Sequence, residues 1–322
     1  MTHAPVSSRI QQLIEACGDI ILTPLREPLI TELMLNPDSV LWVEHRKKGI
    51  IPYGEITPSH AERIIRKTAG ILGLEANYEN PILECEFPVD FSRFEGILPP
   101  LVKNPCFTIR KKAEVIYTLD DFVLMGTLTA AQSEVIRTAI VERKNIVVCG
   151  GPGTGKTTFV NACIAEMAKL CPFDRLLILE DVPELQCSSK NVVHLVTNKM
   201  IKNPVDLQKL IFVAMRSRPD RILIGEVRDK SMLDAMKAWN TGCPGGIVTI
   251  HANDTHSAIE RCLSLAEEAG VVKPISLLLE TIDLIVSIER NNQNQQRVIK
   301  HISMLQGYDP KTGKFLFQDI SK

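Results

Sequence analysis

Residues 150–157 read GGPGTGKT, and these residue types in this order can bind phosphate. The glycines let backbone amides converge on a phosphate, and a helix starting near Lys156 would direct the positive end of its dipole to the same place. In this pattern the lysine contacts the β- and γ-phosphates, and the hydroxyl of Thr157 ligates Mg²⁺. The apolar strand IVVC before the loop favours a nucleotide site over a glycine-rich turn without a ligand. The residues predicted to bind ATP are Gly150, Gly151, Pro152, Gly153, Thr154, Gly155, Lys156, Thr157 and Thr158.

A nucleotide site also needs carboxylates, which hold Mg²⁺ and orient the attacking water at the carboxyl ends of strands beside the loop. Glu180, with Asp181 and Glu184, directly follows the apolar run 176–179, and Glu226 follows the run 222–225. Each acid could instead be a solvated strand end or a helix cap. Because both groups end apolar strands downstream of the phosphate loop, we favour a functional role for Glu180 and Glu226, with Thr157, at a magnesium site.

Cationic and imidazole groups are the third requirement. His251 follows the run 247–250, where a histidine is as consistent with a structural role as with one at the γ-phosphate. Phosphoryl transfer needs positive charge against the developing γ-phosphate, often from another domain or subunit. Sequence spacing does not choose among the arginines, which are Arg93 and Arg110 in the first half and Arg216, Arg218, Arg221 and Arg228 around the second acidic strand.

The elements that must position these residues alternate along the second half of the chain. Short apolar runs rich in β-branched residues alternate with helical patterns, which predicts a parallel sheet covered on both faces. A threonine–glutamine capping box at 129–132 opens the first of these helices. The predicted strands are 146–149, 176–179, 192–196, 222–224 and 247–250, and the predicted helices are 129–140, from 156, about 205–216 and from about 230.

The first half of the chain predicts a separate, compact α+β domain. Helical spacing at 10–14 and a Thr-Pro start at 57–58 indicate two helices, and the runs 40–44, 83–87 and 107–110 indicate strands. The length of 322 residues suits about two domains. We therefore predict an amino-terminal domain at 1–118, a linker at 119–128 and an ATPase domain at 129–322. Near the end, a loop is predicted at 291–296 and a hairpin turn at 309–313.

Composition narrows the class of protein. Lys and Arg (37) nearly balance Asp and Glu (38), and the net charge of −1 argues against direct DNA binding. The nine cysteines form no CxxC pair, which indicates reduced thiols in a cytosolic protein. The first residues lack a signal-peptide pattern, and no apolar run approaches the ~20 residues of a membrane span. We expect a cytoplasmic protein, at most peripheral to a membrane.

Four motifs in order resemble those of the secretion or traffic ATPases of bacterial type II and type IV systems. They are GGPGTGKTT (150–158), LILEDVPEL (177–185), RPDRILIGEVRD (218–229) and GGIVTIHAND (245–254), which that family calls the Walker A, Asp box, Walker B and His box. TELMLNPDSVLWVE (31–44), RFEGILPP (93–100) and FTIRKK (107–112) are similar to the amino-terminal domain of the conjugation branch, the TrbB-like ATPases. The resemblance covers nearly the whole chain. Only Cys243 and Cys262 follow the Walker B segment, so the tetracysteine module of many type II members is absent from the sequence.

The resemblance implies a RecA-like P-loop domain and a homo-hexameric ring that binds ATP and Mg²⁺ between the two domains. It implies that Glu180 and Glu226 serve magnesium and water activation and that His251 senses the γ-phosphate. Arg93 and Arg110 become candidates for contacting the γ-phosphate, and Arg216 for serving the neighbouring subunit. The implied partners are inner-membrane components of a secretion or conjugation apparatus, and the implied activity powers pilus assembly or substrate transfer.

Two rival functions remain at this stage. A nucleic-acid translocase or helicase would show salt-dependent DNA affinity and DNA-stimulated hydrolysis, which the near-neutral charge disfavours. A nucleotide-locked assembly scaffold would not need Glu180 and Glu226, whose presence favours hydrolysis.

Overall fold

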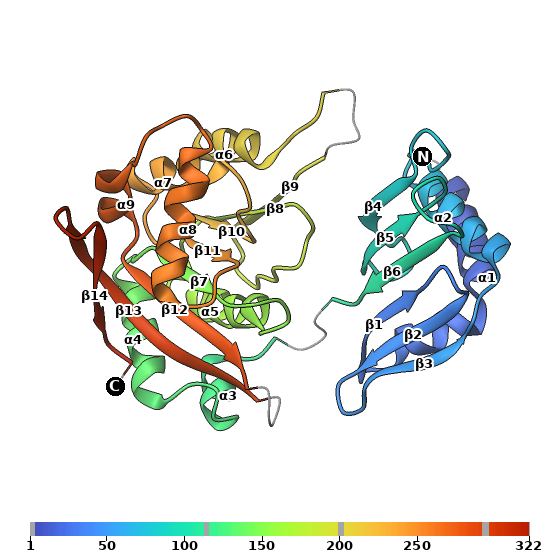
Figure 1. The fold of residues 1–322 in the computed structure, drawn as a ribbon, viewed down its shortest axis with the longest axis horizontal. Coiled ribbons are helices and arrows are strands. Elements are labelled where there is room, and N and C mark those ends of the chain that lie inside the picture. Colours follow the sequence, from blue (N-terminus) through green and yellow to red (C-terminus); the bar gives the residue numbers. More distant parts are fainter. Residues whose placement is uncertain (1–3, 113–115, 199–202, 292–295, 322) are drawn as a thin grey trace. The chain divides into compact units, whose positions relative to one another are not determined.

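The computed structural model describes residues 4–112, 116–198, 203–291 and 296–321. Contacts divide the chain into two compact units, 1–114 and 115–322 (Figure 1). Each unit has its own buried apolar core.

The first unit is an antiparallel sheet with two helices, α1 (Ala4–Arg26) and α2 (Pro58–Ile71), packed against it and against each other (Figure 1). The strand order is β3-β2-β1-β6-β5-β4. Leu33, Val43 and Ile109 point to the helix-covered face and are fully buried, which follows from the alternation of side chains along a strand. The strands are β1 (Ile30–Leu35), β2 (Val40–His45), β3 (Gly49–Glu55), β4 (Ile82–Glu86), β5 (Arg93–Ile97) and β6 (Cys106–Arg110).

The second unit is built on a mainly parallel sheet in the order β14-β13-β12-β7-β11-β10-β8-β9. The strands from β12 to β9 run parallel, and β13 and β14 add an antiparallel hairpin at one edge. The strands are β7 (Ile146–Cys149), β8 (Leu176–Glu180), β9 (Val192–Val196), β10 (Arg221–Ile224), β11 (Ile247–Ile250), β12 (Leu284–Arg290), β13 (Arg297–Asp309) and β14 (Lys314–Asp319). Every residue of β7, β10 and β11 is buried, as expected for strands covered on both faces.

Helices cover both faces of this sheet, and each face has its own hydrophobic core (Figure 1). On one side lie α3 (Leu119–Leu124), α4 (Ala130–Val141) and α5 (Lys156–Leu170). On the other side lie α6 (Leu207–Met215), α7 (Ser231–Asn240), α8 (Thr255–Glu267) and α9 (Ile275–Thr281). The fold confirms the predicted α/β domain with a mainly parallel sheet, preceded by a smaller α+β domain.

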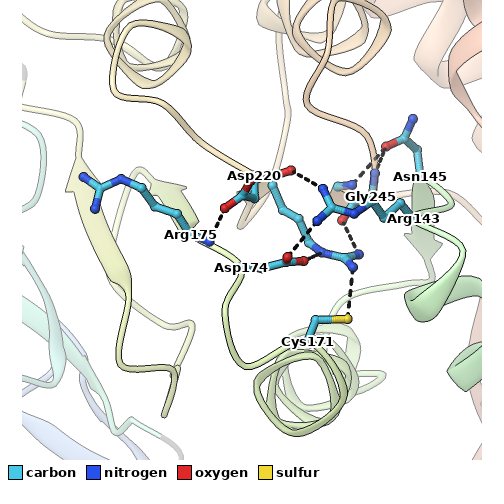
Figure 2. Close-up of polar contacts among 9 residues, drawn as sticks. Arg143, Asn145, Cys171, Asp174, Arg175, Asp220 and Gly245 are labelled. Carbon is cyan, nitrogen blue, oxygen red and sulfur yellow. Dashed lines mark hydrogen bonds and ion pairs between the residues drawn. The ribbon is translucent and has the colours of Figure 1, made fainter.

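A buried ion-pair network fixes the start of β10 (Figure 2). The side chain of Arg221 is fully buried, and its Nε donates to Oδ2 of Asp174 at 2.6 Å. Its Nη2 lies 3.3 Å from the sulfur of Cys171, and Oδ1 of Asp174 accepts from Nη2 of Arg143 at 2.7 Å. Because a buried charge is stable only when paired, this network holds the strand that precedes Glu226.

Asn145 ties the start of β11 to the start of β7 (Figure 2). Its Oδ1 accepts hydrogen bonds from the backbone amides of Gly245 (2.8 Å) and Gly246 (2.9 Å). A Cβ at Gly246 would overlap the indole nitrogen of Trp239, so this position needs glycine. The two strands that lead to the phosphate loop and to His251 are therefore aligned from their opposite ends.

The structure differs from the sequence prediction in several elements. Residues 119–128, predicted as a linker, contain α3, which a capping box between Thr118 and Asp121 starts and whose Leu119 and Phe122 are buried. The prediction also omitted β1, β5, α8, α9 and β12. The hairpin turn at 309–313 is confirmed between β13 and β14. The predicted loop 291–296 falls largely on 292–295, which lie outside the described residues.

No helix within the described ranges is long and apolar enough to cross a membrane.

Candidate nucleotide-binding site

The predicted phosphate loop lies at the carboxyl end of the central strand β7 and runs into α5. Gly153 (φ 68°) and Gly155 (φ 96°) adopt the left-handed conformation that the loop requires and that glycine tolerates best. A Cβ at Gly150 would overlap the carbonyl oxygen of Ile288 in β12. The backbone thus forms an open cradle ahead of the N-terminus of α5, where helix amides and the helix dipole favour an anion.

Lys156 is folded back onto the loop that carries it. Its Nζ donates to the carbonyl oxygens of Gly150 (2.9 Å) and Gly151 (3.0 Å) and lies 3.3 Å from Nδ1 of His251. The lysine is buried, with 8% of its surface exposed. Its ammonium group is therefore placed beside the loop and beside the end of β11, as a phosphate-binding lysine requires.

The carboxylates after β8 have different tasks. Glu180 is buried (3% exposed), and its Oε1 accepts hydrogen bonds from the backbone amides of Glu184 (2.9 Å) and Leu185 (2.8 Å). These bonds curl the chain after β8 back toward α5. In consequence Oε2 of Glu184 lies 3.3 Å from the hydroxyl of Thr157. Glu180 organises this loop, and Glu184 supplies a carboxylate to the threonine of the phosphate loop.

Glu226 follows β10 and contacts both Arg228 and His251. Its Oε2 accepts from Nη2 of Arg228 at 2.7 Å, and its Oε1 lies 3.1 Å from Nε2 of His251. Burial acts to raise the pKa of Glu226, but the hydrogen bond and charge of Arg228, with the charges of His251 and Lys156, outweigh it and hold this pKa below its usual value. The group is an ionised acceptor at neutral pH.

His251 lies between Lys156 and Glu226. Burial and the charge of Lys156 lower the pKa of His251 more than Glu226 raises it, so the imidazole is neutral near pH 7. Nδ1 of the ring faces the ammonium of Lys156 at 3.3 Å, and Nε2 faces Oε1 of Glu226 at 3.1 Å. The structure thus brings together four predicted residues, since Thr157 joins Lys156, Glu226 and His251 at one edge of the sheet.

The site fits a magnesium–nucleotide better than a bare metal ion. Oε1 of Glu226 is buried, and no described group gives it a well-aligned hydrogen bond. Over the ranges that the structure describes, no three His, Cys, Asp or Glu side chains could hold a metal alone. Mg²⁺ keeps most of its waters and binds through one or two protein groups plus phosphate oxygens. Thr157 and Glu226, with Glu180 or Glu184, would supply those protein groups.

A pocket of about 310 Å³ opens beside the loop. It is lined by residues 150–152, by His251 and Asn253 after β11, and by Ser257 and Arg261 on α8. Sequence reasoning missed Arg261, because α8 itself was not predicted. It also missed Arg297 at the start of β13, whose side chain packs so closely that a Cβ at Gly155 would lie 3.0 Å from its Cδ.

The predicted arginines have different surroundings. Arg93 and Arg110 face each other directly across β5 and β6, and each pairs with a carboxylate, Glu84 at 3.1 Å and Glu32 at 3.2 Å. They belong to the first unit, whereas the phosphate loop belongs to the second. Arg216 is an exposed residue at the end of α6. Their part in the site remains a prediction.

The fold and the site define a P-loop ATPase with a RecA-like second unit. The chain belongs to the family described as "Type II/IV secretion system protein", whose model matches residues 86–311.

Similar proteins align with this chain over most of their own length. It is 44% identical to the conjugal transfer protein TrbB of Rhizobium radiobacter over 93% of this chain and 91% of that protein. It is 28% identical to the type IV secretion system protein PtlH of Bordetella pertussis over 81% and 86% of the two chains. Among solved structures, the ATPase DotB of Legionella pneumophila matches 90% of this chain and 80% of its own, with a TM-score of 0.62 and 17% identity, which shows a shared fold.

Proposed function

We propose that the chain is an ATP-hydrolysing motor that energises pilus assembly or substrate transfer in a conjugative type IV secretion system. The observation that carries the proposal is the cluster formed by Lys156, Thr157, Glu226 and His251, in a chain 44% identical to a conjugal transfer protein. This cluster has the acceptor, cation and hydroxyl groups that phosphoryl transfer uses.

In this proposal residues 150–158 bind ATP, and Lys156 exchanges its contacts with the loop carbonyls for contacts with the β- and γ-phosphates. Thr157, Glu180 and Glu226 serve Mg²⁺, which would neutralise charge on the phosphates. Glu226, ionised and beside His251, orients the attacking water. His251 senses the γ-phosphate through its contact with Lys156.

The active assembly in this proposal is a homo-hexameric ring that works at the cytoplasmic face of the inner membrane with membrane components of the secretion apparatus. Arg93, Arg110 and Arg216 supply positive charge to the γ-phosphate in that assembly. The cross-strand pairing of Arg93 with Arg110 supports this role, because a triphosphate favours two adjacent guanidinium groups over one.

The test is ATP hydrolysis by the purified chain with Mg²⁺, comparing wild type with Lys156→Ala and Glu226→Gln. Native mass is measured with and without ATP, and DNA is added to parallel samples. Glu142→Gln, at the exposed end of α4, is the matched control for loss of a carboxylate.

We expect Glu226→Gln to bind ATP but lose roughly 100-fold or more in turnover, since water orientation and general base catalysis contribute about that much. We expect Lys156→Ala to lose both binding and turnover, and Glu142→Gln to behave as wild type. Unchanged turnover in Lys156→Ala would refute the enzymatic role. A monomer at all nucleotide concentrations would refute the ring, and strong stimulation by DNA would favour a nucleic-acid translocase.

A further inference from the structure

The pocket beside the phosphate loop has the chemistry of an anion site. Its polar groups are the imidazole of His251, the amide of Asn253, the hydroxyl of Ser257 and the guanidinium of Arg261, and no carboxylate lines it. The nearby carboxylate of Asp254 is engaged as the cap of α8, where it accepts from the amide (2.7 Å) and hydroxyl (2.6 Å) of Ser257.

Helix α8 presents Arg261 to this pocket. Ser257 and Arg261 are four residues apart, so they lie on one face of the helix, and both line the pocket with residues 150–152. The guanidinium of Arg261 makes no hydrogen bond or ion pair with any part of the chain that the structure describes. A planar guanidinium with uncommitted donors is suited to phosphate oxygens.

The position of the pocket indicates which phosphate of a bound nucleotide would enter it. The amides near the N-terminus of α5 serve the α- and β-phosphates, and the P-loop lysine reaches the β- and γ-phosphates. The pocket borders the opposite, leading end of the loop and His251, which contacts Lys156. A phosphate in the pocket would therefore extend beyond the β-phosphate.

We propose that Arg261 binds the terminal phosphate of a nucleotide held by the same subunit. The chain would then distinguish ATP from ADP by the contact between this phosphate and Arg261 on α8. This inference rests on the proposed function, because it requires that the loop binds nucleotide. It adds a phosphate-binding residue that is separate from Arg93, Arg110 and Arg216.

The experiment measures the dissociation constants of ADP and of a non-hydrolysable ATP analogue, both with Mg²⁺, on the full chain. The variants are Arg261→Gln and Arg261→Lys, and Lys237→Gln on α7 is the matched control for loss of one exposed positive charge. We expect Arg261→Gln to weaken the analogue about tenfold or more and to leave ADP within about twofold, because a hydrogen bond to a charged group is lost only for the triphosphate. Arg261→Lys should recover part of the loss, since it keeps the charge but not the planar fork.

Equal weakening of both nucleotides would overturn the inference, because it would indicate a structural role or a contact with the diphosphate. An unchanged preference for the triphosphate in Arg261→Gln would overturn it as well, while hydrolysis by the same variant would leave the proposed function standing. If wild type binds neither nucleotide, both the proposed function and this inference fail.

Discussion

Replacing Glu180 by Ala and by Gln would separate its structural role from its role in hydrolysis. The buried carboxylate accepts hydrogen bonds from two backbone amides, at 2.9 and 2.8 Å. Each hydrogen bond to a charged group contributes about 1.5–3 kcal/mol. Alanine removes the one oxygen that accepts both bonds and leaves the amide of Leu185 buried without it, so we expect Glu180→Ala to lower the free energy of unfolding of the second unit by roughly 3–5 kcal/mol.

Glutamine keeps an acceptor oxygen at the same position and loses only the charge. We therefore expect Glu180→Gln to cost about 1 kcal/mol. If Glu180 also serves magnesium or water, this variant should still lose roughly 100-fold in ATP turnover despite its stability. The two substitutions thus differ in stability but not in their effect on turnover.

The assay uses the two tryptophans of the chain, of which Trp239 is 2% exposed in α7 of the second unit. Trp42→Phe leaves Trp239 as the fluorescent probe, and within the described residues the indole nitrogen of Trp42 has no hydrogen bond to lose. Urea titration in this background reports on the second unit, and Glu142→Ala serves as a control for loss of an exposed glutamate. Equal destabilisation by Ala and Gln, or a loss below about 1 kcal/mol in Glu180→Ala, would refute the reasoning.

Two further predictions concern the supports of the site. Arg221→Met should lower the free energy of unfolding by about 3 kcal/mol, measured by the same urea titration. This value is at the low end for a broken buried ion pair, because Arg143 still pairs with Asp174. A smaller loss would show that the network is unimportant for stability. Asp254→Ala should cost about 1 kcal/mol through loss of the cap of α8. The hydrogen bonds from Ser257 lower the pKa of Asp254, so its contribution is complete above pH ~3.8 and is lost as the pH falls through the lowered pKa. The difference in melting temperature between wild type and Asp254→Ala should therefore be smaller at pH 3 than at pH 5. An equal difference at both pH values would contradict this assignment.

The residues that the sequence located well are those fixed by local pattern. The phosphate loop, Glu226 and His251 each come after a short, largely apolar strand, and parallel strands bring their carboxyl ends to one edge. Neither the strand order nor a side-chain contact is needed for that inference. The predicted fold class follows from the same alternation of strands and helices.

The contacts that could not be predicted from the sequence depend on the conformation of loops and on residues far apart in the sequence. Glu184 reaches Thr157 only because Glu180 binds the amides of the loop after β8, and this curl has no periodic signal. Arg261 lies on a helix that the sequence pattern did not reveal, although Asp254 and Ser257 form a capping box at its start. Helix α3 was missed because it is six residues long and too short to show a helical repeat.

In the first unit, the pairing of Arg93 with Arg110 could not be predicted, because the strands are short. No strand was predicted at Arg93–Ile97, so the direct opposition of Arg93 and Arg110 is visible only from the sheet register. The register could not be predicted because it depends on which strands pair, and β5 pairs with β6 across a loop that contains three prolines.

The contacts of Lys156 with its own loop bear on how such an ATPase can exchange its nucleotide. When a phosphate leaves, the ammonium group of Lys156 can return to the carbonyl oxygens of Gly150 and Gly151, at 2.9 and 3.0 Å. Release of the product therefore leaves no buried charge without a partner. The emptied loop has no need to collapse or to recruit a counter-ion before the next nucleotide arrives. Binding and release then become an exchange of oxygen partners at one nitrogen atom.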